Sequence, residues 1–155
     1  MAAVFVTVSY LLVVLLQVGG LPTGPMPDGL SSFERSRLTA AQNIEKRIKI
    51  YAEASNDRRR SVERAVAEQD FDGIALILRS WAEVLDSSLI DIQANAGKKA
   101  RSGALKNYEI QLRKAMSAVS DLKTKGSYEQ LENFESWLRH AGEVQKKLVA
   151  ILFPS

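Results

Sequence analysis

Residues 105–122 read LKNYEIQLRKAMSAVSDL, and their apolar side chains recur at alternating steps of three and four residues. The stripe consists of Leu105, Tyr108, Leu112, Ala115, Val119 and Leu122. Side chains at this spacing share one face of an α-helix, whereas a half-buried strand would alternate strictly. Such a seam is typical of a coiled-coil helix that packs nearly parallel to its neighbours.

Three further segments have the same helical period. Their apolar stripes are, in chain order, Ile44, Ile48, Tyr51, Ser55, Val62 and Val66; Ile74, Ile77, Leu78, Trp81, Leu85, Ser88 and Ile92; and Leu131, Phe134, Leu138, Ala141, Leu148 and Leu152. We expect N-caps at Thr39, Asp72 and Ser102, because a short polar side chain can accept a hydrogen bond from the first helical turn. Ser127 and Gln130 have the spacing of a capping box for the last helix.

Turn-forming residues separate the four segments. Residues 70–73 and the glycine-containing stretch 95–103 interrupt the period, and Lys125 with Gly126 forms a basic last turn and a helix stop. Short connections between long helices imply antiparallel neighbours. The sequence therefore predicts an all-α fold, namely an up-and-down antiparallel four-helix bundle over residues 38–153.

The N-terminal part of the chain has the character of a membrane-directed segment. Residues 1–27 carry no charge, and residues 2–16 are almost continuously apolar. This pattern favours a signal peptide of residues 1–20, followed by a Pro- and Gly-rich linker over residues 21–37. The alternative is a retained anchor over residues 2–21, which could span a hydrocarbon core of roughly 30 Å. A buried domain helix fits less well, because the segment has no polar stripe. Both leading interpretations predict an extracytoplasmic protein, either periplasmic or secreted.

The sign of the charge alternates along the rest of the chain. The net charge is +5 over residues 35–64, −5 over residues 65–95, +6 over residues 96–125 and −1 over residues 126–155. In an up-and-down bundle each basic helix would lie beside acidic ones. We expect these charges to neutralise one another and to favour that topology rather than to add stability, since exposed pairs contribute only about 0 to 1 kcal/mol each.

The composition excludes several classes of chemistry. The 155 residues, 46% of them hydrophobic and 25% charged, suit one globular domain. The chain has no cysteine, which excludes disulfides, thiolate nucleophiles and Cys-based metal centres. It has one histidine, His140, which excludes sites that need paired histidines. Because no phosphate loop, dinucleotide fingerprint or calcium loop occurs either, we expect no cofactor and no metal.

His140 is the residue most able to carry catalysis. Glu143 and Glu135 lie near it in sequence, and Ser136 lies one helical turn before it. A hydrolase would also need an oxyanion hole and a buried acid, which this spacing on one exposed helix does not supply. We interpret His140 as a surface or rim residue, Asp70 and Asp72 as turn and capping residues rather than a catalytic pair, and the chain as not an enzyme with no catalytic residues.

Aromatic and basic residues raise two further possibilities. The aromatic side chains are expected mainly in the core, although some could line a ligand pocket between helices; they are Trp81, Trp137, Tyr51, Tyr108, Tyr128, Phe71, Phe134 and Phe153. A nucleic-acid site is not expected from the arginines of residues 58–64, because a helix turns consecutive side chains by about 100°. Lys98, Lys99 and Arg101 are the better candidates for contact with an anionic membrane surface.

The overall pattern resembles small exported bacterial all-helical proteins to which no function is assigned. The shared features are the leader, a helical hairpin with Ser80-Trp81, a basic connection, a helix bearing Tyr108, and Ser136-Trp137 on the last helix. The resemblance implies export and an all-helical fold, and it transfers no site residue.

Our expectation for function is a non-enzymatic extracytoplasmic protein that acts by contact with a protein partner, as an adaptor, scaffold or binding protein. Two alternatives remain. One is a membrane-anchored bundle that touches anionic lipid. The other is a small-molecule-binding bundle, which would need a cavity lined by Trp81, Trp137 or Tyr108 together with a convergent polar group.

Overall fold

The computed structural model describes residues 29–95 and 102–154, and these residues form helices and no strand. The helices are α1 (Ser32–Ala40), α2 (Ile44–Glu68), α3 (Phe71–Asn95), α4 (Gly103–Lys123), a short 3-10 helix (Tyr128–Gln130) and α5 (Leu131–Leu152). The predicted all-α class is therefore confirmed for the part of the chain that the structure describes. The leader of residues 1–20, most of the linker, and the basic residues Lys98, Lys99 and Arg101 lie outside these ranges.

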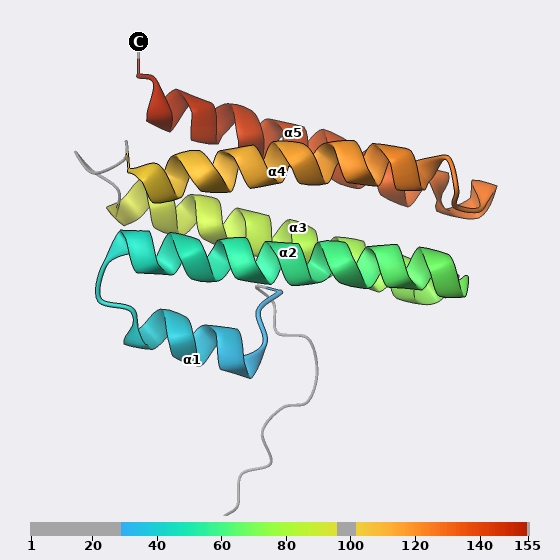
Figure 1. Ribbon diagram of the computed structural model, residues 1–155, viewed down its shortest axis with the longest axis horizontal. Coiled ribbons are helices and arrows are strands. Elements are labelled where there is room, and N and C mark those ends of the chain that lie inside the picture. The colour runs from blue at the N-terminus through green and yellow to red at the C-terminus, as the bar shows by residue number, and fades with distance from the viewer. Residues whose placement is uncertain (1–28, 96–101, 155) are drawn as a thin grey trace, which may run out of the picture.

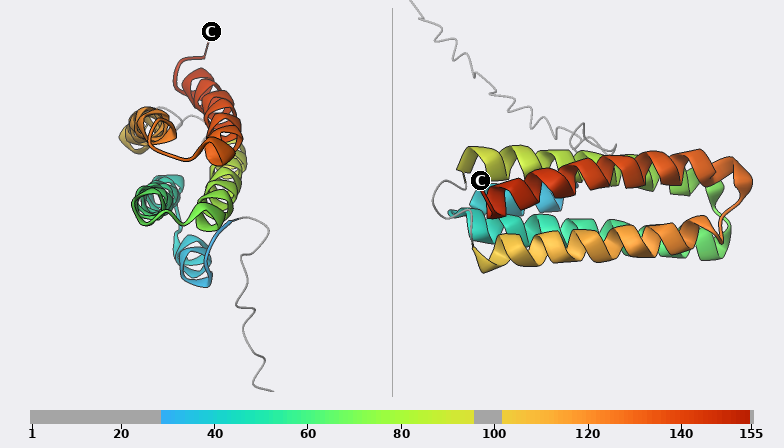
Figure 2. Two further views of the ribbon diagram at one scale, coloured as in Figure 1. Left: turned by 90° about the vertical axis from the view of Figure 1, so that its right-hand side faces the viewer. Right: turned by 90° about the horizontal axis from the view of Figure 1, so that it is seen from above.

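The four long helices pack side by side as two antiparallel hairpins, α2 with α3 and α4 with α5 (Figure 1). The end-on view shows that α2 also lies beside α4, and α3 beside α5 (Figure 2). Within each of these two pairs the helices run in the same direction. Helices α3 and α4 are consecutive in the chain, but they are therefore diagonally opposite each other in the arrangement of the four long helices.

This neighbour order corrects the charge argument. We expected each basic helix to lie between acidic ones, but the two basic segments of the chain contribute neighbouring helices, α2 and α4. The connection from Asn95 to Ser102 permits the diagonal step, because its seven residue steps can span up to about 24 Å. Helix neighbours lie only about 8 to 10 Å apart, which puts the diagonal at roughly 14 Å.

The core contains two indole rings in contact. The ring centroids of Trp81 on α3 and Trp137 on α5 are 4.1 Å apart, with the ring planes tilted by 41°. The Trp81 indole N–H donates to the Ser55 hydroxyl of α2 at 2.7 Å, and the Tyr108 phenol of α4 is 2.8 Å from the Ser88 hydroxyl of α3. These two polar bonds join α3 to α2 and to α4 inside an otherwise apolar interior, whereas α5 meets α3 through the indole contact.

Helix α1 was not expected from the sequence. It occupies residues assigned to the linker and to the start of the bundle, and it begins with a capping box formed by Ser31 and Glu34. The predicted N-cap Thr39 is wrong: it lies inside α1 and donates to the Arg35 carbonyl, while Asn43 caps α2 by accepting from Lys46 N–H at 2.9 Å. In Figure 1, α1 lies alongside α2, outside the four long helices.

The other predicted helix starts have mixed outcomes. Ser102 caps α4 as expected, by accepting from the backbone N–H of Leu105. Asp72 is not the cap of α3, because the Asp70 side chain accepts from Gly73 N–H at 3.0 Å instead. A Cβ on Gly73 would lie 2.1 Å from an Asp70 carboxylate oxygen, so a larger residue there would displace the Asp70 side chain from its capping position. Residues 127–130 do not form a capping box but lead into the 3-10 turn.

Candidate functional site

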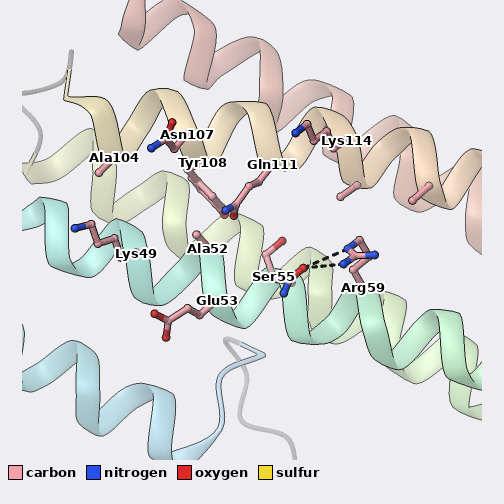
Figure 3. Close-up of a pocket in the computed structure, with 13 residues that line it drawn as sticks. Lys49, Ala52, Glu53, Ser55, Arg59, Ala104, Asn107, Tyr108, Gln111 and Lys114 are labelled. Carbon is pink, nitrogen blue, oxygen red and sulfur yellow. Dashed lines mark hydrogen bonds between the residues drawn. The ribbon is translucent and has the colours of Figure 1, made fainter.

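A groove of about 600 Å³ runs between the parallel helices α2 and α4 (Figure 3). Small side chains account for it, because the facing positions of the two helices carry alanines where larger residues would fill the space. These alanines are Ala52 on α2 and Ala104, Ala115 and Ala118 on α4. The amides Asn107 and Gln111 stand along the α4 side.

The charged groups of this groove are mainly cationic. Its lining includes Lys49, Arg59 and Lys114, with Glu53 as the acidic member. Glu53 is already paired with Arg37 of α1 at 2.5 Å. Lys49 and Lys114 have no carboxylate within ion-pair distance among the described residues, whereas Arg59 is paired with Glu63. Two unneutralised ammonium groups therefore face the groove from opposite helices.

The floor of the groove is held in place by the core. Tyr108 lines the groove, but its phenol is bonded to Ser88, and full burial raises its pKa well above the ordinary value of 10. The Ser55 hydroxyl is occupied as the acceptor of the Trp81 indole. These groups shape the groove and supply neither an acid nor a nucleophile at neutral pH.

A second groove, of about 330 Å³, lies between α3 and α5. Ser136 and His140 of α5 line it together with Arg79 of α3, and Trp137 forms part of its wall. His140 Nε2 lies 2.9 Å from an Asp86 carboxylate oxygen, although the geometry is not that of a hydrogen bond. The carboxylate beside the histidine thus comes from a neighbouring helix.

This finding corrects the expected partners of His140. Glu135 instead pairs with Lys123 at 3.5 Å, and Glu143 has no ion pair with His140 among the described residues. Sequence spacing contains no signal for Asp86, because the contact depends on how α3 and α5 pack. The Ser136 hydroxyl makes no hydrogen bond to His140 in the described structure, so a nucleophile–base contact is not formed.

The three consecutive arginines of residues 58–60 have different environments and do not form one basic patch. Arg58 is bonded to the Glu34 carboxylate and to the Gly29 carbonyl, Arg59 faces the α2/α4 groove, and Arg60 is exposed. The helical turn of about 100° per residue separates them, as the sequence predicts.

The aromatic residues divide between core and surface. The prediction of core packing is confirmed for five of them, namely Tyr51, Trp81, Tyr108, Phe134 and Trp137. It is wrong for Tyr128 and Phe153, which are 89% and 70% exposed. Both lie near helix ends, where the neighbouring helices no longer cover them.

Groups that could hold a metal ion do not occur in the described ranges, since no three histidine, aspartate or glutamate side chains gather there. Among the helices of residues 29–95 and 102–154, none combines the length and the apolar character needed to cross a membrane. Comparisons with protein-family models, with curated proteins and with solved structures find no match to this chain.

Proposed function

We propose that this chain is a non-enzymatic extracytoplasmic binding protein, a four-helix bundle of α2–α5 braced by α1. Its α2/α4 groove takes an acidic segment of a protein partner. The observation that carries this proposal is the pair of unneutralised lysines, Lys49 and Lys114, over a floor of small side chains. A peptide backbone fits over alanines, and its carboxylates complement the ammonium groups.

Charge reversal in the groove tests the proposal. The probe is a fluorescently labelled glutamate-rich peptide, and its binding is measured by fluorescence anisotropy at physiological ionic strength. We expect K49E/K114E to weaken binding by about tenfold or more, because two attractive contacts become repulsive. The matched control is K146E/K147E, which makes the same charge change on exposed positions of α5.

Three outcomes would contradict this function. One is the absence of saturable peptide binding, and another is an equal loss in the groove and control variants, which would indicate attraction to net charge alone. The third is binding to anionic vesicles with an affinity that K49E/K114E does not change. That result would favour the lipid-contacting alternative through Lys98, Lys99 and Arg101.

Export is a separate part of the proposal, supported by the uncharged apolar sequence of residues 1–20. Intact-mass analysis of the exported protein is expected to show that these residues are missing. A mass that includes them would favour the anchored form.

A further inference from the structure

The α3/α5 groove contains an unsatisfied buried donor. Trp137 is 3% exposed, and its indole nitrogen has no hydrogen-bond partner among the described residues. Its stacking partner Trp81 is as deeply buried but donates to Ser55 at 2.7 Å. Nearly all buried polar groups in proteins are hydrogen-bonded, so the Trp137 N–H marks a place where an acceptor is missing.

The polar side chains that line the groove with Trp137 are Arg79, Asn133, Ser136 and His140. Arg79 on α3 lines the groove and has no carboxylate partner in the described part of the chain. Ser136 on α5 adds a hydroxyl that makes no hydrogen bond to another described residue, and His140 Nε2 lies 2.9 Å from an Asp86 carboxylate oxygen. The Arg79 guanidinium thus has no carboxylate partner among the described residues, which fits a ligand with a single negative charge.

The α3 side of the lining is mostly apolar. Ala75, Leu78 and Ala82 form the α3 wall opposite the Trp137 ring. The volume of about 330 Å³ lies at the lower end of the range for small-molecule sites, roughly 300 to 1,000 Å³. Flat apolar walls next to a guanidinium suit a compact molecule with one planar apolar part and one carboxylate.

The geometry points to the α3/α5 groove as a binding site for a small aromatic monocarboxylate, with Arg79 and Ser136 holding the carboxylate and the Trp137 N–H supplying a further donor. The indole nitrogen is buried in this structure, so the ligand contacts it only when neighbouring side chains move. Helices α3 and α5 lie on the side opposite to α2 and α4 (Figure 2), so this site is separate from the α2/α4 groove and does not depend on the function proposed for it.

The two tryptophans supply the test. In a ¹⁵N-labelled sample each indole N–H gives its own NMR signal, and Trp137→Phe identifies which is which. Titration with sodium benzoate is expected to shift the Trp137 signal saturably and to leave the bonded Trp81 signal nearly in place. Benzamide has the same ring without the charge, and we expect it to bind about tenfold more weakly or worse.

Variants distinguish benzoate binding at this site from general electrostatic attraction to the protein. Arg79→Gln and Ser136→Ala are both expected to weaken benzoate binding, with the arginine variant losing about tenfold or more. Arg139→Gln removes a neighbouring exposed charge that does not line the groove, and K49E/K114E alters the other groove; both are expected to bind benzoate normally. A linear shift without saturation, equal binding of benzamide, or an unchanged affinity in Arg79→Gln would overturn the inference.

Discussion

The small side chain of Ser55 fixes the position of the large Trp81 side chain. The buried hydroxyl accepts the Trp81 indole N–H, so the polar edge of the fully buried tryptophan is satisfied. The sequence placed Ser55 on the apolar stripe of its helix, and burial there is confirmed. Its bond to Trp81 could not be predicted, because the two residues belong to different helices and only the packing brings them together.

Removal of this hydroxyl is expected to destabilise the fold. Ser55→Ala leaves the Trp81 donor buried without an acceptor, which costs about 1 to 3 kcal/mol. Urea denaturation followed by circular dichroism measures the free energy of unfolding. The control is Ser117→Ala, an exposed position on α4, and a loss in Ser55→Ala no greater than in the control would contradict this account.

Glu34 makes the stability dependent on pH. Burial opposes ionisation of this carboxyl, but hydrogen bonds from Arg58 and from the Ser31 backbone outweigh it, so the pKa is below the ordinary value of 4.5. The unfolded chain therefore takes up the proton first as the pH falls. The stabilisation is complete above the ordinary pKa and is lost as the pH drops through the lower folded-state value.

Glu34→Gln is expected to lower the free energy of unfolding by about 1 to 2 kcal/mol at neutral pH, because the charged hydrogen bonds of the carboxylate to Arg58 and to the Ser31 N–H are lost. The difference from the unmodified chain should shrink on acidification, since only the carboxylate is titrated. Urea unfolding at several pH values measures this trend. Glu68→Gln, at an exposed position, is the control, and a difference that stays constant with pH would refute the assignment.

At the level of the helices, α1 is held against α2 by arginines of α2. Arg58 donates to the Gly29 carbonyl at 2.6 Å and to Glu34, and Arg47 donates to the Leu38 carbonyl at 2.8 Å. The capping box that begins α1 was readable in the sequence. The helix was missed because it follows the Pro- and Gly-rich stretch and has too few apolar residues to show a stripe.

Arg58→Ala is expected to loosen α1 and leave the long helices folded. Hydrogen exchange of the α1 amides should quicken by about tenfold to a hundredfold, the equivalent of losing charged hydrogen bonds, while core amides of α3 and α5 stay protected. Arg60→Ala, two residues further along and exposed, is the control. Equal effects from the two substitutions, or loss of protection throughout, would show that α1 is not held in this way.

At the scale of the whole molecule, the sequence predicted four long helices and most of the buried positions, but not which helices are neighbours. Each stripe is a similar row of Leu, Ile, Val and Ala, so the stripes do not specify a partner. The order depends on complementary shapes, such as the indole pair between α3 and α5 and the alanines between α2 and α4. Both grooves are products of that order, which is why neither could be located from the sequence.

Placing two basic helices side by side costs stability. Lys49 and Lys114 face one groove with Arg59, so neutralising the two lysines relieves repulsion. K49Q/K114Q is expected to raise the free energy of unfolding by about 0.5 to 1 kcal/mol at low ionic strength, and added salt should remove the gain. K146Q/K147Q is the control in urea unfolding, and an equal gain there would assign the effect to net charge.

The closeness of the two indole rings has a consequence for optical spectroscopy. At 4.1 Å between centroids their electronic transitions couple, and the tilt of 41° gives the coupled pair a handedness. Since one ring belongs to each hairpin, the resulting near-ultraviolet signal reports whether the hairpins are docked. The signal of the indole pair thus distinguishes separation of the two hairpins from the unfolding of individual helices.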